Sequence, residues 1–237
     1  MNKSSYLAVC LMMISTVGMA HAAGDPKAGE AKAELCLDCH GVGGNSEDPT
    51  FPKLAGQFNY YIIKQIKKFK SGERKDDTMT DMAMMIETDQ DLEDIAAYFS
   101  SQPDMEGTPT DPPLMVDRVI KKRGEKERVI SVPVVKVGKD IFMDGGFTKC
   151  FECHGVDARG KGGMMKGAPK LAGQHKEYML KSMDDIYNHK RQADTFDLMW
   201  RGLHSLDKEE WGFVAEYLSG LQSAEEGIAE ESTEESQ

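Results

Sequence analysis

Apolar side chains recur about every 3.6 residues in several segments of this chain, which is the spacing of amphipathic helices. In the first half, this spacing predicts helices over residues 26–36, 59–70 and 88–99. In the second half, it predicts helices over residues 139–144, 176–188 and 208–221. No convincing strand pattern occurs among these helices, so the sequence predicts an all-α fold.

Residues that favour helix N-termini support two of these predictions. Asp25 can accept hydrogen bonds from the free backbone N–H groups of a first turn. Pro26 suits the first helical position, because the N–H that proline lacks has no partner there. Thr88 and Asp91 resemble a capping box, which places the start of another helix at residue 88.

One long apolar run lacks this amphipathic spacing. It extends from Tyr6 to Ala20, follows Lys3 and ends in small residues. This is the pattern of a secretory signal peptide. The run is also shorter than the roughly 20 residues that a membrane-spanning helix needs. We therefore expect residues 1–22 to be a cleaved signal peptide, with a mature chain that begins at Ala23 and contains no transmembrane span.

The chain is acidic, with 29 basic residues, 40 acidic residues and a formal net charge of −11. This charge argues against nucleic acid as a partner, because phosphates are bound by cations. Six glutamates and no base occur in the last 14 residues. We therefore expect residues 223–237 to be an acidic, disordered tail.

Two segments of the chain are copies of one another. Residues 35–102 and 149–222 each contain a Cys-x-x-Cys-His motif, a glycine-rich loop, a tyrosine-led helix, a methionine-containing segment and a closing helix, in the same order. The hexapeptide Pro-Lys-Leu-Ala-Gly-Gln occurs at residues 52–57 and again at 169–174. Such repetition indicates two domains of common ancestry. Each is too small to bury a large apolar core alone, so a cofactor can complete it.

Four of the five cysteines form two Cys-x-x-Cys pairs, and a histidine directly follows each pair. These residues are Cys36, Cys39 and His40 in the first copy, and Cys150, Cys153 and His154 in the second. The pattern is the attachment signature of a covalently bound c-type haem, present twice. Two thiols one helical turn apart can add to the two vinyl groups of one haem, and the adjacent histidine can then bind the iron.

Three other uses of these cysteines fit less well. An exported chain could form two disulfides, four thiolates could hold zinc, and a Cys-x-x-Cys pair could be a redox dithiol. However, cysteine pairs that bind zinc usually lie some 15–20 residues apart, and these pairs are much farther apart. A thioredoxin-like dithiol follows a strand, which residues 27–35 do not resemble.

An electron-transfer haem is best served by a second protein ligand on the iron, because a filled sixth position excludes oxygen. Met199 is the one methionine between the middle and closing helices of the second copy. Met164 and Met165, in the earlier glycine-rich loop, are its rivals.

The equivalent segment of the first copy offers a choice of four methionines, Met79, Met82, Met84 and Met85. Alignment forward from the hexapeptide pairs Met82 with Met199, whereas alignment back from the closing helix favours Met79. Flexible core packing is the alternative role for methionines in such a cluster.

Taken together, these motifs resemble the cytochrome c4 family of dihaem class I cytochromes c. The resemblance rests on the haem motifs, the two hexapeptides, the closing-helix sequences of residues 91–99 and 214–218, and the start Ala23-Gly24-Asp25. It implies two tandem class I cytochrome c domains, at residues 23–102 and 137–222, each wrapped around one haem. It also implies histidine–methionine ligation of both irons. Because residues 74–79 resemble the family's ligand segment, Met79 is the preferred first-domain ligand.

The resemblance further implies a function. Such a protein carries single electrons in the periplasm between respiratory partners, towards a terminal oxidase. Its partners are then redox proteins: a membrane-bound oxidase or cytochrome complex, or a periplasmic dehydrogenase. The alternative is a haem-bearing subunit of a periplasmic oxidoreductase, such as a thiosulfate-oxidising or peroxidase-type dihaem enzyme. An enzyme needs an open or cysteine-bound iron, and no spare cysteine is present, so we expect a carrier rather than an enzyme.

Several other residues have expected roles. In class I cytochromes c, a proline carbonyl accepts the second ring N–H of the ligating histidine, which assigns that role to Pro52 and Pro169. Leu54 and Leu171 are expected to contact the haem faces. Three histidines of the second copy have no counterpart in the first and are expected at the surface or at helix caps: His175, His189 and His204.

The linker of residues 103–136 departs from the family because it is longer than expected. It contains five prolines, a basic stretch at residues 121–128 and a β-prone segment at residues 129–132. Its composition favours a solvated loop. The alternative is a docking element for an acidic partner or for the acidic tail. The added length puts in doubt whether the two domains pack together as in the family.

Overall fold

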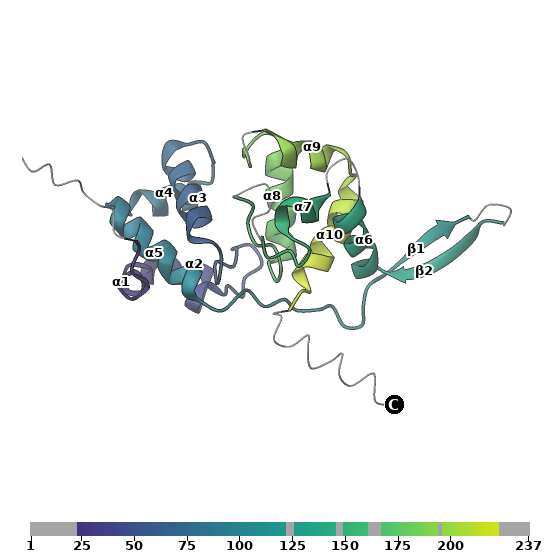
Figure 1. The fold of residues 1–237 in the computed structure, drawn as a ribbon, viewed down its shortest axis with the longest axis horizontal. Coiled ribbons are helices and arrows are strands. Elements are labelled where there is room, and N and C mark those ends of the chain that lie inside the picture. The colour runs from purple at the N-terminus through teal and green to yellow at the C-terminus, as the bar shows by residue number, and fades with distance from the viewer. Residues whose placement is uncertain (1–22, 122–125, 146–148, 161–166, 194–195, 223–237) are drawn as a thin grey trace, which may run out of the picture.

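The computed structural model describes residues 23–121, 126–145, 149–160, 167–193 and 196–222. Two helical domains lie side by side, and a β-hairpin projects from the second (Figure 1). The predicted signal peptide, the acidic tail, Met164 and Met165 lie outside the described residues. Among the described residues, no helix is both long and apolar enough to cross a membrane.

The first domain is built from short helices. They are α1 (Pro26–Lys32), α2 (Glu34–His40), the 3₁₀ turn η1 (Val42–Gly44), α3 (Asn59–Ser71), α4 (Asp77–Met84) and α5 (Asp89–Ser101). The predicted caps are confirmed, since Asp25 accepts the N–H of Lys27 and Thr88 accepts that of Asp91. The single helix predicted over residues 26–36 was wrong, because α1 ends at Lys32 and α2 follows one residue later.

The second domain repeats this plan. Its helices are α6 (Val134–Asp144), α7 (Cys150–His154), α8 (Lys176–Tyr187), α9 (Leu198–His204) and α10 (Lys208–Ser219). Helix α10 begins with a full capping box between Asp207 and Glu210. Helix α6 starts earlier than the prediction at residue 139, because Pro133 ends the preceding strand and leads directly into it.

In each domain the first and last helices cross at a glycine. A Cβ atom at Gly29 would lie 1.9 Å from the carbonyl oxygen of Asp94, where α1 crosses α5. At Gly138, where α6 crosses α10, it would lie 1.9 Å from the carbonyl oxygen of Phe213. No side chain fits in so short a distance, so both crossings require glycine. The two domains therefore share the same close helix crossing, which holds the first helix of each domain, just before the haem motif, against the last helix.

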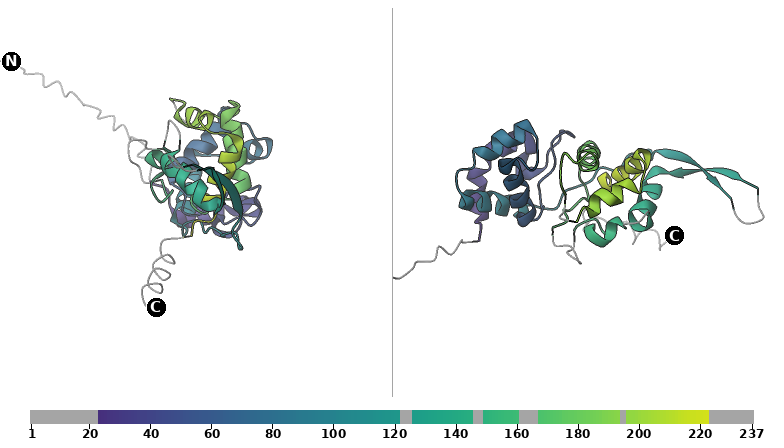
Figure 2. Two further views of the ribbon diagram at one scale, coloured as in Figure 1. Left: turned by 90° about the vertical axis from the view of Figure 1, so that its right-hand side faces the viewer. Right: turned by 90° about the horizontal axis from the view of Figure 1, so that it is seen from above.

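The linker is not a simple solvated loop, and that interpretation was wrong for most of its length. Its first part packs on the second domain, where Met105 is buried and the N–H of Thr108 donates to the carbonyl of Ser219 at 3.1 Å. Its second part forms the antiparallel hairpin of β1 (Met115–Ile120) and β2 (Arg128–Pro133). The hairpin extends away from both domains when the molecule is seen from above (Figure 2, right). The β-branched residues of these segments favour the strands.

Candidate haem sites

The first Cys-x-x-Cys-His motif lies in a short helix whose last residue, the histidine, is buried. Helix α2 carries Cys36, Cys39 and His40, and His40 is 5% exposed. The Nδ1 atom of His40 lies 2.8 Å from the carbonyl oxygen of Pro52. A carbonyl only accepts, so Nδ1 donates and Nε2 is left as the ring nitrogen that can bind a metal. The expected role of Pro52 is confirmed.

The second motif has the same geometry. Helix α7 carries Cys150, Cys153 and His154, and the Nδ1 atom of His154 lies 3.0 Å from the carbonyl oxygen of Pro169. Burial lowers the pKa of both motif histidines, although the hydrogen bonds to the proline carbonyls oppose this. Each imidazole is therefore held neutral, which is the form that binds iron.

The state of the four cysteines argues against their alternative uses. None of the four forms a disulfide, so the structure does not support two disulfides. Burial raises the pKa of Cys150 to about 11 and raises that of Cys36 as well. A reactive dithiol has a lowered thiol pKa instead. In the part of the chain that the structure describes, no group of three or more His, Cys, Asp or Glu side chains could hold a metal ion such as zinc.

The candidate methionine of the first domain lies on α4, an element that sequence periodicity did not predict. Asp76 caps this helix by accepting the N–H of Met79 at 3.1 Å. Met79 and Met82 are both half-buried and share one face of the helix, because they lie three residues apart. Met84 and Met85 are 64% and 58% exposed, which disfavours them as ligands of a buried iron.

The candidate methionine of the second domain lies on α9 and packs against the core of that domain. Beside it, an aromatic stack runs along the surface. The ring of His204 lies 4.0 Å from that of Tyr187 and 3.8 Å from that of Trp200, and His189 stacks on the other side of Trp200 at 5.1 Å. Both histidines are exposed, as expected, but their stacking was not predicted.

The identical hexapeptides meet each other across the domain boundary. The side-chain amide of Gln174 accepts the N–H of Lys53 and donates to the carbonyl of Lys53, both at 2.9 Å. In the same way, Gln57 accepts the N–H of Lys170 and donates to its carbonyl, both at 3.0 Å. Both glutamines are buried. This reciprocal arrangement pairs the domains around an approximate two-fold axis.

A second reciprocal group, missed by sequence reasoning, joins α3 and α8. Arg74 donates to the hydroxyl of Tyr178 at 3.0 Å, and Arg191 donates to the hydroxyl of Tyr61. Both arginines also bond Gln65. Although burial opposes the shift, the charges of the two arginines lower the pKa of Tyr178 to about 7. The signal was available, since the tyrosines and the arginines are separated by the same interval as the hexapeptides.

These residues fit two haems. Each histidine has one ring nitrogen fixed by a carbonyl and the other open to a metal, and the two cysteines of each pair lie one helical turn apart and form no disulfide. The Nε atom of Arg191 is buried and has no hydrogen-bond partner among the described residues. A buried cationic N–H group without a partner suits a carboxylate, which is what a haem propionate supplies.

Comparison with known proteins agrees with this geometry. The family model described as Cytochrome c matches residues 27–103 and 135–222. Cytochrome c4 of Stutzerimonas stutzeri is 38% identical over 231 residues, covering 93% of this chain and 100% of that protein. The chain belongs to the cytochrome c4 family.

Solved structures give the same result. A structure of reduced recombinant cytochrome c4 from Pseudomonas stutzeri matches with a TM-score of 0.70 and 34% identity, covering 84% of this chain and 100% of that one. A more distant relative is the thiosulfate dehydrogenase electron acceptor of Stutzerimonas stutzeri strain A1501, which is 26% identical over 82% of each chain.

Membership of the cytochrome c4 family confirms three expectations. The fold consists of two tandem helical cytochrome c domains, to which the linker adds a small sheet. The protein carries two covalently attached c-type haems, at the Cys36/Cys39 and Cys150/Cys153 motifs. Cytochromes c4 are electron carriers that work with redox partners.

Proposed function

We propose that this protein carries single electrons in the periplasm, passing them through its two haems in series to a respiratory partner, in the first place a terminal oxidase. The observation that carries the proposal is the pair of equivalent haem motifs, each with its histidine fixed by a proline carbonyl. Two haems that are held by equivalent motifs suit an electron carrier, whereas an enzyme needs one haem that differs from the other as its catalytic site.

Each haem is held by residues of one domain. Cys36 and Cys39 attach the first haem and Cys150 and Cys153 the second, while the iron ligands are His40 with Met79 and His154 with Met199. Haem supplies a reversible Fe(II)/Fe(III) couple. The protein fixes the histidine orientation, fills the sixth iron position and keeps water away, so that little rearrangement accompanies a change of oxidation state.

Transfer in series needs the two domains to keep a constant relative position. The buried Gln57 and Gln174 side chains supply four direct hydrogen bonds between them. Buried Arg191 adds bonds to Tyr61 and Gln65 of the first domain. Satisfied buried polar groups of this kind are costly to separate, because each would be left without a partner. The interface therefore favours a rigid pair of haems over two independent ones.

The test is kinetic. Reduced protein is mixed in a stopped-flow instrument with membrane vesicles that contain a terminal oxidase and with oxygen. We expect both haems to be oxidised over many turnovers, with cyanide abolishing the reaction. The Met199→Ala variant should slow it, because a lowered potential at that haem makes its reduction by the other haem less favourable. A protein whose haems stay reduced while the oxidase turns over another donor would refute the direction of transfer.

A second candidate role follows from the relative named as an electron acceptor of thiosulfate dehydrogenase. In that role a periplasmic dehydrogenase would be the electron donor to this protein. Thiosulfate added to the purified protein with such a dehydrogenase should then reduce both haems. Reduction by thiosulfate without the dehydrogenase would instead identify the chain as part of an enzyme.

A further inference from the structure

The β1–β2 hairpin is a part of the molecule that neither haem site uses. It extends beyond α6, away from both domains (Figure 1). Val119 and Val129 lie opposite each other on its two strands and are 66% and 65% exposed. Val116 and Val132 pack on the second domain, but the hairpin projects beyond that contact, and a two-stranded ribbon by itself is marginally stable in water. An exposed apolar pair on such an arm is therefore expected to gain from contact with another surface.

A groove runs between α6 and one face of this hairpin. Its volume is about 380 Å³. Its apolar lining comes from both elements and consists of Ile120, Ile130, Val132, Val137 and Ile141. Its charged lining consists of Arg118, Lys136, Asp140 and Asp144. A groove of this size takes two or three aliphatic side chains, and its mixed charges suit an occupant that carries both signs.

The hairpin and the end of α6 have opposite charge. The described hairpin residues include four cations, Arg118, Lys121, Lys126 and Arg128, against the anions Asp117 and Glu127. Helix α6 ends in Asp140 and Asp144 and has no basic residue in its last turn. The C-terminal end of a helix also carries partial negative charge. The end of α6 therefore attracts cations.

The charged groups of the hairpin and of α6 form exposed local ion pairs, including one on the hairpin in which Lys121 lies 3.2 Å from Glu127. Asp140 lies 2.9 Å from Lys136, and Asp144 lies 3.2 Å from Lys149. All of these side chains are largely exposed, with Asp144 at 82%. Exposed ion pairs contribute about 0–1 kcal/mol, so their members can exchange partners readily.

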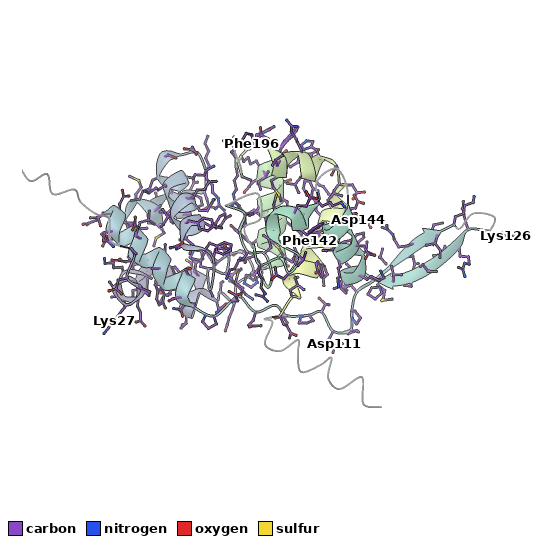
Figure 3. The ribbon with its side chains drawn as sticks, in the orientation of Figure 1. Lys27, Asp111, Lys126, Phe142, Asp144 and Phe196 are labelled. Atoms are coloured by element: carbon purple, nitrogen blue, oxygen red, sulfur yellow. The ribbon has the colours of Figure 1, made fainter. Side chains whose placement is uncertain are left out.

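One copy of the chain cannot bring its own complementary parts together. Lys126 lies at the outer end of the hairpin, whereas Asp144 lies at its base beside the second domain (Figure 3). Val119 and Val129 alternate along the strands with Ile120 and Ile130, so they point to the face of the hairpin opposite to the groove. Two hairpins placed antiparallel would bring the outer end of each to the base of the other.

We propose that two copies of this chain associate through their hairpins about a two-fold axis. Val119 and Val129 of each copy occupy the groove between hairpin and α6 of the other. Lys121 and Lys126 of each copy face Asp140 and Asp144 of the other. The contact is self-complementary, as a two-fold dimer requires. The acidic tail is a poorer occupant, because Ile228 is its only large apolar residue.

The area of this contact predicts a weak dimer. A six-residue strand is about 20 Å long, so two exchanged hairpins bury on the order of 800 Å² in total, below the 1,200–2,000 Å² of stable complexes. We therefore expect association in the micromolar range that depends on protein concentration. Because exposed charges contribute, added salt should weaken it.

The test is sedimentation velocity of the purified dihaem protein, followed by haem absorbance from low micromolar to near millimolar concentration. The sedimentation coefficient should rise with concentration towards that of a dimer. The Val119→Asp/Val129→Asp variant should weaken association by at least about tenfold, as expected for loss of a central apolar contact. Val42→Asp is the matched control, because Val42 is 87% exposed in the first domain, and it should leave association unchanged.

A charge exchange tests the orientation. Lys121→Glu and Asp144→Lys should each weaken the dimer, and the two together should restore it. Unchanged haem absorption and unfolding temperature show that each variant is folded. The proposal is overturned if the protein stays monomeric throughout, if the valine variant associates normally, or if the monomer binds phosphatidylglycerol vesicles instead.

Discussion

Residues that are identical at equivalent positions of the two domains have a different role from residues that differ between them. Lys53 and Lys170, like Gln57 and Gln174, occupy equivalent positions and make reciprocal hydrogen bonds across the interface. Preserved positions therefore hold the domains together.

Positions where the copies diverge give each domain its own surroundings. His175 reaches the carbonyl of Ser46 through Nε2 at 2.8 Å, but its counterpart Phe58 packs against Gly160. The methionine segment is a capped helix in the first domain, whereas α9 begins after Asp197 with a positive φ and no side-chain cap. The aromatic stack beside Met199 belongs to the second domain. We infer that the two haems are held alike but tuned differently.

The largest expected effect comes from the proposed methionine ligands. Loss of a methionine ligand should lower the potential of the affected haem by on the order of 0.1 V, because axial ligation sets haem potential over a wide range. Met79→Ala and Met199→Ala should each change one of the two potentials and each remove about half of the far-red sulfur-to-iron absorption band of the oxidised protein.

The matched control is Met82→Ala, which shares a face of α4 with Met79. It should leave the band intact. If Met82→Ala removes the band and Met79→Ala does not, then the first-domain ligand is Met82.

The two interface arginines should differ in their effect on stability. Arg191 is buried and Arg74 is half-buried. Arg191→Ala leaves buried partners unpaired and should lower the free energy of unfolding by about 2–4 kcal/mol, whereas Arg74→Ala should lower it by about 1–2 kcal/mol. Thermal unfolding followed by circular dichroism measures both. An equal loss of unfolding free energy in the two variants would show that the deeper burial of Arg191 does not make its hydrogen bonds more stabilising than those of Arg74.

The two hexapeptide glutamines should instead behave alike. Gln57→Ala and Gln174→Ala each remove a buried amide that bonds one lysine backbone, so each should lower the free energy of unfolding by about 1–3 kcal/mol. The double variant should cost roughly the sum, because the two bonded pairs share no residue. Chemical denaturation gives these values. A loss confined to one variant would contradict the reciprocal interface.

The smallest expected effect is the loss of stability at low pH when the Asp94 carboxylate is protonated. Hydrogen bonds from Lys32, from the N–H of Asp25 and from Gln90 lower the pKa of Asp94 to about 2. An unfolded aspartate titrates at about 3.9. The stabilisation by Asp94 is therefore complete above about pH 4 and is lost as pH falls through about 2. In the second domain, burial raises the pKa of Glu216, which is not equivalent to Asp94 in the repeat, but hydrogen bonds from Lys176 and Thr110 lower it overall.

Denaturant midpoints measured across this acid range test the effect. Asp94→Asn should remove part of the pH dependence, with the loss confined to the first domain. An unchanged acid profile would mean that the Asp94 carboxylate adds no stability.

Much of the haem chemistry could be predicted from sequence, because it depends on local spacing. The Cys-x-x-Cys-His motifs and the proline carbonyls lie within short segments, and helices α3, α5, α8 and α10 follow clear apolar periodicity. Helix α4 was missed, since it is only eight residues long, half of them polar, and its start depends on the single cap of Asp76. The sequence and the helix geometry also leave the choice between Met79 and Met82 open, because both methionines lie on the same half-buried face of α4.

Other features could not be predicted because they depend on contacts between distant segments. The repeat interval marks Arg191 and Tyr61 as members of equivalent pairs, but nothing local to either residue indicates that they meet across the domain boundary. The glycines at the helix crossings are needed only because another backbone passes within contact distance. The hairpin was hidden by the charged stretch of residues 121–128, whose composition resembles that of a loop, although the β-prone residues 129–132 gave a partial signal.

The most direct test of two alike but differently tuned haems is a redox titration of the purified protein, followed optically at the haem bands. We predict two one-electron steps of equal amplitude with separate potentials, both in the range of histidine–methionine haems, and no binding of carbon monoxide by the reduced protein. A single step of one haem, or ready binding of carbon monoxide at either iron, would contradict this interpretation and favour an enzyme with an open site.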